Sequence, residues 1–129
     1  MSEKKKKSII TKWMDNCMIC GRPNPDIHHG LYGNKHQLAD QDGILMPLCQ
    51  YHHNSLNTYE VKRKPVVNMS VHQNEEMKVL SQQLSQLAWE RWYLAQKLSE
   101  FEEQGHQSAD DWMDEAREAF RVRYGESYL

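Results

Sequence analysis

Two pairs of metal-binding side chains constrain the fold of this chain more than any other feature. The pairs are Cys17-Met-Ile-Cys20 and Cys49-Gln-Tyr-His52, and Cys49 follows Cys20 by 29 residues. At this spacing two thiolates, or a thiolate and an imidazole, reach one ion from a single turn, as a tetrahedral zinc site requires. The segment between the pairs must then fold back as a hairpin. Free cytosolic thiols with incidental spacing are the alternative interpretation.

Composition explains why such a chain needs a metal. The 129 residues are enough for one domain, yet only 39% are hydrophobic and the mean hydropathy is −0.88. A structural zinc ion contributes about 10 kcal/mol to folding, which compensates for a small core. Three cysteines, an odd number, favour metal binding over disulfides in a reducing compartment. Because no membrane span or signal peptide is recognisable, we expect a soluble, cytoplasmic protein without a membrane partner.

Charge divides the chain into a basic and an acidic half. Residues 1–72 carry ten Lys or Arg against six Asp or Glu, a net +4, whereas residues 73–129 carry six against twelve, a net −6. The basic half is able to meet nucleic-acid phosphates. We predict a basic flexible arm over 1–12, a zinc-stapled domain over 13–72 and a helical arm over 73–129. The candidate phosphate contacts are Lys35, Lys62, Arg63 and Lys64, with a solvated loop as the equal alternative for the last three.

The periodicity of apolar residues predicts an α+β fold. Residues 13–59 suit short strands and tight loops, with a helix near their end from about Cys49 to Asn57. Alternate spacings of three and four then predict a long helix over residues 72–101. Its apolar stripe consists of Met77, Leu80, Leu84, Leu87, Leu94, Leu98 and Phe101, with Arg91 filling the gap. This stripe packs on the metal half, on the last helix, or on a second copy as a homodimer through residues 77–101.

A final helix is expected over residues 109–124. Ser108 is its predicted N-cap and Gly125 its stop. Trp112, Ala116, Phe120 and Tyr124 recur every four residues and give this helix one apolar edge.

The histidines exceed what a four-ligand zinc site uses. His53 and Asn57 share a helix face at i and i+4, and a strand-borne His28 would complete an open site for a divalent cation. Neighbouring side chains on a strand point to opposite sides, so one of His28 and His29 binds metal while the other contacts substrate or water. That division suits hydrolysis, in which a neutral imidazole takes a proton from water.

Three segments of the chain resemble the HNH (ββα-metal) endonuclease family, in the variant where a zinc clip pins a hairpin to a helix. They are Cys17-Met-Ile-Cys20, Ile27-His28-His29-Gly30 and residues 44–54. The chain is also similar to small HNH proteins of phages and prophages, some tied to recombination. Those proteins share a later Val-His element, which here reads Val71-His72-Gln73-Asn74, and an ending like residues 124–129. The resemblance implies a ββα-metal core followed by a long helix and a C-terminal helix.

The resemblance also implies roles for individual residues. It makes His29 the general base and assigns a catalytic Mg²⁺ or Mn²⁺ to His28 and His53, with Asn57 or His72 as the third ligand. The structural zinc belongs to Cys17, Cys20, Cys49 and His52, where the histidine replaces the usual fourth cysteine. Ile44 stands where the family has an asparagine that holds the loop bearing the base. Asn34, Asp40 and Asp42 are the candidate substitutes.

These observations favour a metal-dependent DNA endonuclease that hydrolyses or nicks phosphodiesters in phage or prophage DNA processing or recombination. DNA is then the principal partner, together with a host recombination or replication protein. The alternative is a zinc-stapled DNA- or protein-binding module that has lost hydrolysis, which Ile44 supports. A third interpretation is a coiled-coil assembly protein, but it gives no role to His28, His29 and His53.

Overall fold

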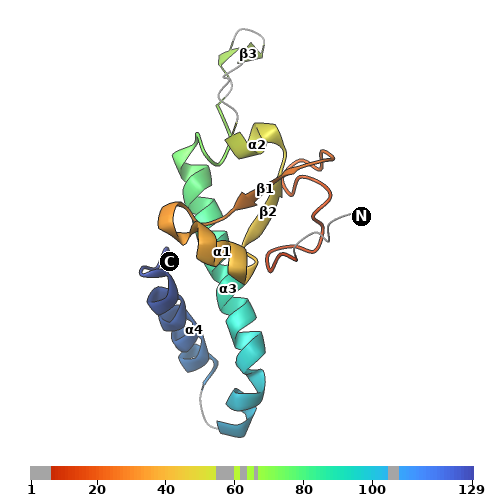
Figure 1. Ribbon diagram of the computed structural model, residues 1–129. Helices are drawn as coiled ribbons and strands as arrows, with labels where there is room; N and C mark the ends of the chain where they lie inside the picture. Colours follow the sequence, from red (N-terminus) through yellow and green to blue (C-terminus); the bar gives the residue numbers. More distant parts are fainter. Residues whose placement is uncertain (1–6, 55–59, 62–63, 66, 105–107) are drawn as a thin grey trace.

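The hairpin required by the two ligand pairs is formed by β1 (Asp26–His29) and β2 (Leu45–Leu48). The computed structural model describes residues 7–54, 60–61, 64–65, 67–104 and 108–129 (Figure 1). The strands are antiparallel, with His28 opposite Met46 and His29 opposite Leu45. All four residues of β2 are buried. The fold is therefore α+β, with helices packed around a two-stranded hairpin.

Helix α2 (Gln50–Asn54) follows β2 directly, and β3 (Glu60–Val61) pairs with β4 (Lys64–Pro65) in a second short hairpin. Helix α3 (Glu75–Gln104) is 30 residues long, the longest helix that the structure describes. Figure 1 shows the first hairpin and α2 gathered beside the N-terminal half of α3, while α4 (Ala109–Tyr124) runs back along its C-terminal half. None of the helices in the described part of the chain is long and apolar enough to span a membrane.

The connection between β1 and β2 differs from the expected strands and loops. It contains a short 3-10 turn, η1 (Gly33–Lys35), and helix α1 (His36–Asp42). The sequence of α1 holds only two apolar residues, Leu38 and Ala39, so it is too short to show a helical period. Gly43 ends the helix in the left-handed conformation, with φ of 77°, and this reversal feeds the chain into β2.

The predicted positions of the two long helices agree with the structure to within three residues. Helix α3 starts at Glu75 rather than near residue 72, because Asn74 Oδ1 accepts a hydrogen bond from the Met77 N–H at 3.0 Å and acts as the N-cap. The predicted limits of α4 are confirmed. Ser108 Oγ accepts from the Asp111 N–H at 3.2 Å, and Gly125 closes the helix with φ of 85°.

The main core lies where α3, α4 and the β1–β2 connection meet. Its fully or nearly fully buried members are Leu31, Ala39, Ile44, Trp89, Phe120 and Tyr124. The N-terminal segment joins this assembly, because Ser8 Oγ donates to the Leu45 carbonyl at 2.6 Å and the Ile9 N–H donates to the Gly43 carbonyl at 2.9 Å. Residues 8 and 9 of the predicted arm are thus hydrogen-bonded to the hairpin.

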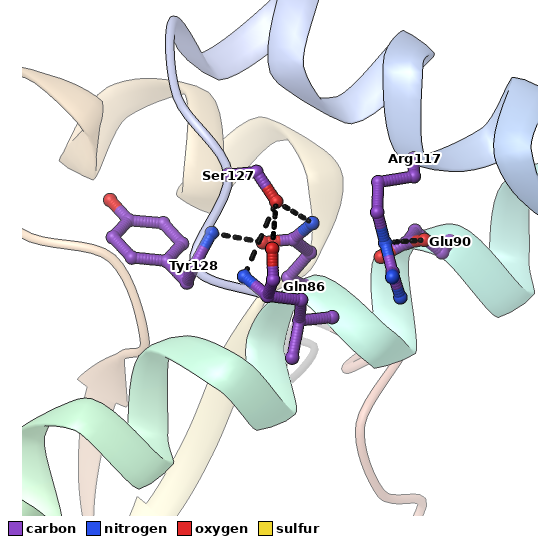
Figure 2. Close-up of polar contacts among 6 residues, drawn as sticks. Gln86, Glu90, Arg117, Ser127 and Tyr128 are labelled. Carbon is purple, nitrogen blue, oxygen red and sulfur yellow. Dashed lines mark hydrogen bonds and ion pairs between the residues drawn. The ribbon is translucent and has the colours of Figure 1, made fainter.

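Polar contacts attach the C-terminal residues to α3 (Figure 2). The buried Gln86 side chain accepts from the Tyr128 N–H at 2.6 Å and donates to Ser127 Oγ at 2.9 Å. One turn further along α3, Glu90 Oε1 accepts from Arg117 Nε at 3.2 Å. The buried Gln86 amide thus provides hydrogen-bond partners for the residues that follow α4, and these bonds fix the register of α4 on α3.

Gly30 is expected to be intolerant of substitution because it lies where the end of β1 touches α3. A Cβ at this position would lie 1.8 Å from Ser85 Oγ, 3.0 Å from Ser85 Cβ and 3.2 Å from Ile44 Cγ2. Rotating the hydroxyl away would break its 2.7 Å hydrogen bond to the Ser81 carbonyl. We predict that Gly30→Ala lowers the free energy of unfolding by about 2 kcal/mol in urea denaturation. Adding Ser85→Ala should restore part of the loss; an unchanged unfolding midpoint in Gly30→Ala would contradict the packing described here.

Candidate metal centres

The first cluster brings together the four predicted zinc ligands. Cys20 Sγ lies 3.6 Å from Cys49 Sγ, and His52 Nδ1 lies 3.7 Å from Cys17 Sγ and 3.3 Å from Cys49 Sγ. A tetrahedral zinc ion with bonds of about 2.0 to 2.3 Å separates its ligand atoms by roughly 3.3 to 3.8 Å. The measured separations agree with this range without rearrangement of the backbone. The Cys₃His cluster could therefore bind a metal such as zinc.

A tight turn presents the first two cysteines. The Cys17 carbonyl accepts from the Gly21 N–H at 2.8 Å, and Gly21 has φ of 80°, a left-handed conformation that glycine adopts without steric cost. The Met18 N–H donates to the Pro47 carbonyl at 2.8 Å, which anchors the turn to β2. Cys49 lies at the end of the same strand, so the turn and the strand bring both ligand pairs to one point.

The electrostatic environment prepares Cys17 for a cation. Burial would raise the pKa of the Cys17 thiol, but backbone hydrogen bonds from Cys49, Cys20 and Ile19, together with the His52 ring, lower it to about 6. At neutral pH the group is then mostly thiolate, the form that binds metal. The site thus has a ligand already deprotonated before an ion arrives.

The second cluster consists of three histidines from three segments. His28 comes from β1, His53 from α2 and His72 from the turn before α3, and one ring nitrogen from each lies within 4.8 Å of the others. The ring centroids are 4.8 to 5.2 Å apart. The predicted His28 and His53 pair is therefore brought together, and His72 joins it as the third side chain. Asn57 lies outside the described residues.

Helix α2 separates the two clusters although their ligands adjoin in sequence. Successive helical residues are about 100° apart, so His52 faces the cysteines while His53 faces His28. The last turn of α2 also positions His72, since the Val71 N–H donates to the His52 carbonyl at 2.8 Å and the His72 N–H to the His53 carbonyl at 3.2 Å. These bonds satisfy carbonyls that a helix end otherwise leaves unpaired.

The three imidazoles differ in burial. His28 is 2% exposed, and burial, followed by repulsion from His72 and His53, lowers its pKa to about 3. Burial also lowers the pKa of His72. A neutral imidazole keeps a lone pair for a cation, so His28 is in its metal-binding form at neutral pH. Around it, Ser81 Oγ and the Tyr32 hydroxyl each lie 3.2 Å from Nε2.

A carboxylate orients one of these histidines. Asp26 Oδ2 lies 3.1 Å from His53 Nδ1, which leaves Nε2 of that ring as the atom available to an ion. A carboxylate behind a histidine fixes the ring and raises its basicity in many metal sites. Sequence reasoning did not single out Asp26, although its place two residues before His28 on β1 puts both side chains on one face of the strand.

His29 lies in a separate polar group. Its Nε2 lies 3.0 Å from Asp40 Oδ1, and the His36 ring is centred 3.8 Å from the His29 ring. Both partners come from α1, the helix that was not predicted. The His29 side chain is 19% exposed, so solvent reaches it. His36, interpreted from the sequence as a solvated side chain, thus contacts the candidate base.

Three residues were predicted to fill the role of the asparagine that the resemblance implies, and of these Asp40 contacts His29. Ile44 is fully buried in the main core. Asp42 instead accepts hydrogen bonds from Arg123 Nε at 2.6 Å and from Trp89 Nε1 at 3.0 Å, so it secures α3 and α4 to the connection. Asn34 is exposed on η1.

The candidate phosphate contacts are only partly described. Lys35 Nζ lies 3.1 Å from Glu126 Oε2, so this cation is paired with the C-terminal segment. Lys62 and Arg63 lie outside the described residues. Lys64 belongs to β4, of which the structure describes the backbone.

Comparisons with known proteins identify no family for this chain. A scan against protein-family models, a search of curated proteins and a search of solved structures each return no match.

Proposed function

We propose that this chain is a metal-dependent DNA endonuclease that hydrolyses phosphodiester bonds, built on a ββα-metal core of β1, β2 and α2. The observation that carries the proposal is the histidine cluster of His28, His53 and His72, which lies beside a complete four-ligand clip. A structural clip has no use for a second cluster. A purely structural protein would also have no use for the partly exposed His29 on the same strand.

The histidine cluster would hold the catalytic cation. A divalent ion bound there supplies positive charge to the scissile phosphate and the leaving oxygen. Imidazole nitrogen is a better ligand for transition metals than for Mg²⁺, which prefers oxygen. Of the two cations expected from the resemblance, the donor set therefore favours Mn²⁺ over Mg²⁺.

His29 would act as the general base. With Nε2–H donating to the Asp40 carboxylate, the proton resides on Nε2 and Nδ1 keeps its lone pair. In hydrolysis, Nδ1 accepts a proton from water as the water oxygen bonds to phosphorus. The P–O bond to one deoxyribose oxygen breaks, and that oxygen then takes up a proton. Asp40 stabilises the imidazolium that forms, in the manner of a carboxylate paired with a catalytic histidine.

The resemblance to small HNH proteins extends this proposal to its setting. It supports processing or recombination of phage or prophage DNA in the cytoplasm of a bacterial host, with a host recombination or replication protein as partner. The basic half of the chain supports contact with DNA phosphates through Lys35 and residues 62–64.

A second candidate function is a zinc-stapled binding module without hydrolysis. Ile44 favours it, because this side chain is 0% exposed at the place where the family has its asparagine. The Asp40 contact to His29 favours the endonuclease, since the orienting role is then filled from α1.

The test is a cleavage assay with zinc-loaded protein on supercoiled plasmid and on single-stranded DNA. We expect nicking in Mn²⁺ at concentrations at least about tenfold below those required for Mg²⁺, and none after chelation. His72→Ala should raise the Mn²⁺ concentration required, whereas His36→Ala, which alters a histidine outside the cluster, should leave it unchanged. Absence of nicking by protein that still binds DNA would support the binding module instead.

A further inference from the structure

Helix α3 exposes its most apolar stripe to solvent. Leu80, Leu87 and Leu98 are 58%, 50% and 53% exposed, and Leu84 is 39% exposed. These side chains follow the alternate three- and four-residue spacing that a second helix of the same period fills. From residue 77 to residue 98 the stripe runs about 32 Å. Apolar surface of this extent on a chain with a small core marks an interaction site.

The opposite face of α3 is the one that packs inside the molecule, and much of it is polar. Ser81, Ser85, Gln86 and Glu90 are all buried, together with Trp89. Ser81 and Ser85 face the β1 end, and Gln86 holds the C-terminal residues (Figure 2). Contacts within one copy therefore bury the small and polar residues of α3 and leave four of its leucines exposed, namely Leu80, Leu84, Leu87 and Leu98.

The stripe continues into a groove on the metal-binding half. Met18 and Ile19, at the tip of the cysteine turn, are 39% and 47% exposed and line this groove with Met77, Leu80 and Leu84. The groove and the stripe form one continuous apolar surface, which we call the α3 seam. Its N-terminal part is thus broader than a single helix face.

Among the residues that the structure describes, no segment covers the exposed leucines of the α3 seam. The residues outside the described part form runs of six or fewer, and the longest, residues 1–6, has one apolar member. Nucleic acid is disfavoured, because α3 carries six glutamates against three Lys or Arg and the seam itself is apolar. A second copy brings a stripe of the same period and length, and twofold pairing of identical patches is the commonest route to closed oligomers.

We propose that two copies of this chain form a homodimer in which the α3 seams pack against each other. Arg91 lies in the middle of the stripe, at a position that a paired helix would cover. A charged residue there limits the strength of the pairing, as single polar residues do in coiled coils. This inference is independent of the proposed endonuclease activity.

Sedimentation equilibrium of the full zinc-loaded chain under reducing conditions tests the proposal. Between about 1 and about 100 µM, a range that brackets micromolar association, the wild type should shift from monomer to dimer. Leu84→Asp/Leu87→Asp should remain monomeric throughout. Val122→Asp, which changes an apolar residue 71% exposed on α4, is the matched control and should dimerise like the wild type.

Arg91→Leu provides a measurement that does not depend on a disruptive variant. It should lower the dissociation constant by about tenfold or more, because the seam becomes continuous. Circular dichroism of each variant establishes that α3 is intact. A wild type that stays monomeric at the highest concentration, or a Leu84→Asp/Leu87→Asp variant that dimerises normally, would overturn the proposal.

Discussion

Chelation of the zinc that we expect at the Cys₃His cluster should unfold this protein rather than merely loosen it. A structural zinc site contributes about 10 kcal/mol, which is comparable to the whole stability of a typical domain, about 5 to 15 kcal/mol. The cluster of Cys17, Cys20, Cys49 and His52 joins the cysteine turn to the end of β2 and the start of α2. We predict that chelation abolishes the cooperative thermal transition and removes most of the helical circular dichroism.

Two substitutions of His52 distinguish the effect of losing a zinc ligand from the effect of changing the side chain. His52→Ala should release zinc and unfold in the same way, whereas His52→Cys should keep one zinc per chain and a thermal transition near that of the wild type. The reason is that four cysteines bind zinc as readily as three cysteines and one histidine. A chelated protein with an unchanged melting temperature would show that the clip is not what holds the hairpin.

The Cys₃His cluster was predictable from sequence because its geometry is local. Each pair of ligands lies within one turn, so spacing alone specifies the site, and the hairpin follows from closing it. The limits of α4 were predictable for a similar reason. Ser108 and Gly125 act through hydrogen bonds and backbone conformation within a few residues of the helix ends.

The orientation of α3 was not predictable. A heptad pattern identifies an apolar stripe, but it does not identify the segment that packs against that stripe. Intramolecular packing selects the face that carries Ser81 and Ser85, since small side chains let β1 and Gly30 approach the helix closely. A sequence-based expectation assigns apolar residues to the interior, and here three of the leucines on the stripe are at least half exposed. Which face of α3 is buried depends on contacts between segments about 50 residues apart in the sequence, such as Gly30 and Ser81.

The carboxylates beside the histidines also depend on distant parts of the chain. Asp40 reaches His29 from α1, a seven-residue helix with no recognisable period, and Asp26 reaches His53 across 27 residues. Sequence reasoning could name Asp40 among several acidic and amide residues, but only the fold selects it. The histidines themselves were found from their excess over a four-ligand site.

His29→Ala is expected to have the largest effect on catalysis. Loss of a general base lowers the rate by about 10²- to 10⁴-fold, and we predict a decrease in this range in plasmid nicking at saturating Mn²⁺. The fold should survive, because the side chain is partly exposed at the surface, and metal content and DNA affinity should match those of the wild type. Thermal melts, metal analysis and DNA-binding titrations check these three expectations.

Asp40→Ala and His36→Ala distinguish a base held by a carboxylate from a histidine with a merely structural role. Asp40→Ala removes the group that keeps the proton on Nε2, so nicking should fall by about tenfold or more while His29 remains in place. His36→Ala removes a ring in contact with His29 without touching that hydrogen bond, and its rate should stay within a few-fold of the wild type. If His29→Ala nicks plasmid as fast as the wild type, the base must be sought elsewhere. If Asp40→Ala alone leaves the rate unchanged, His29 does not depend on α1 for its tautomer.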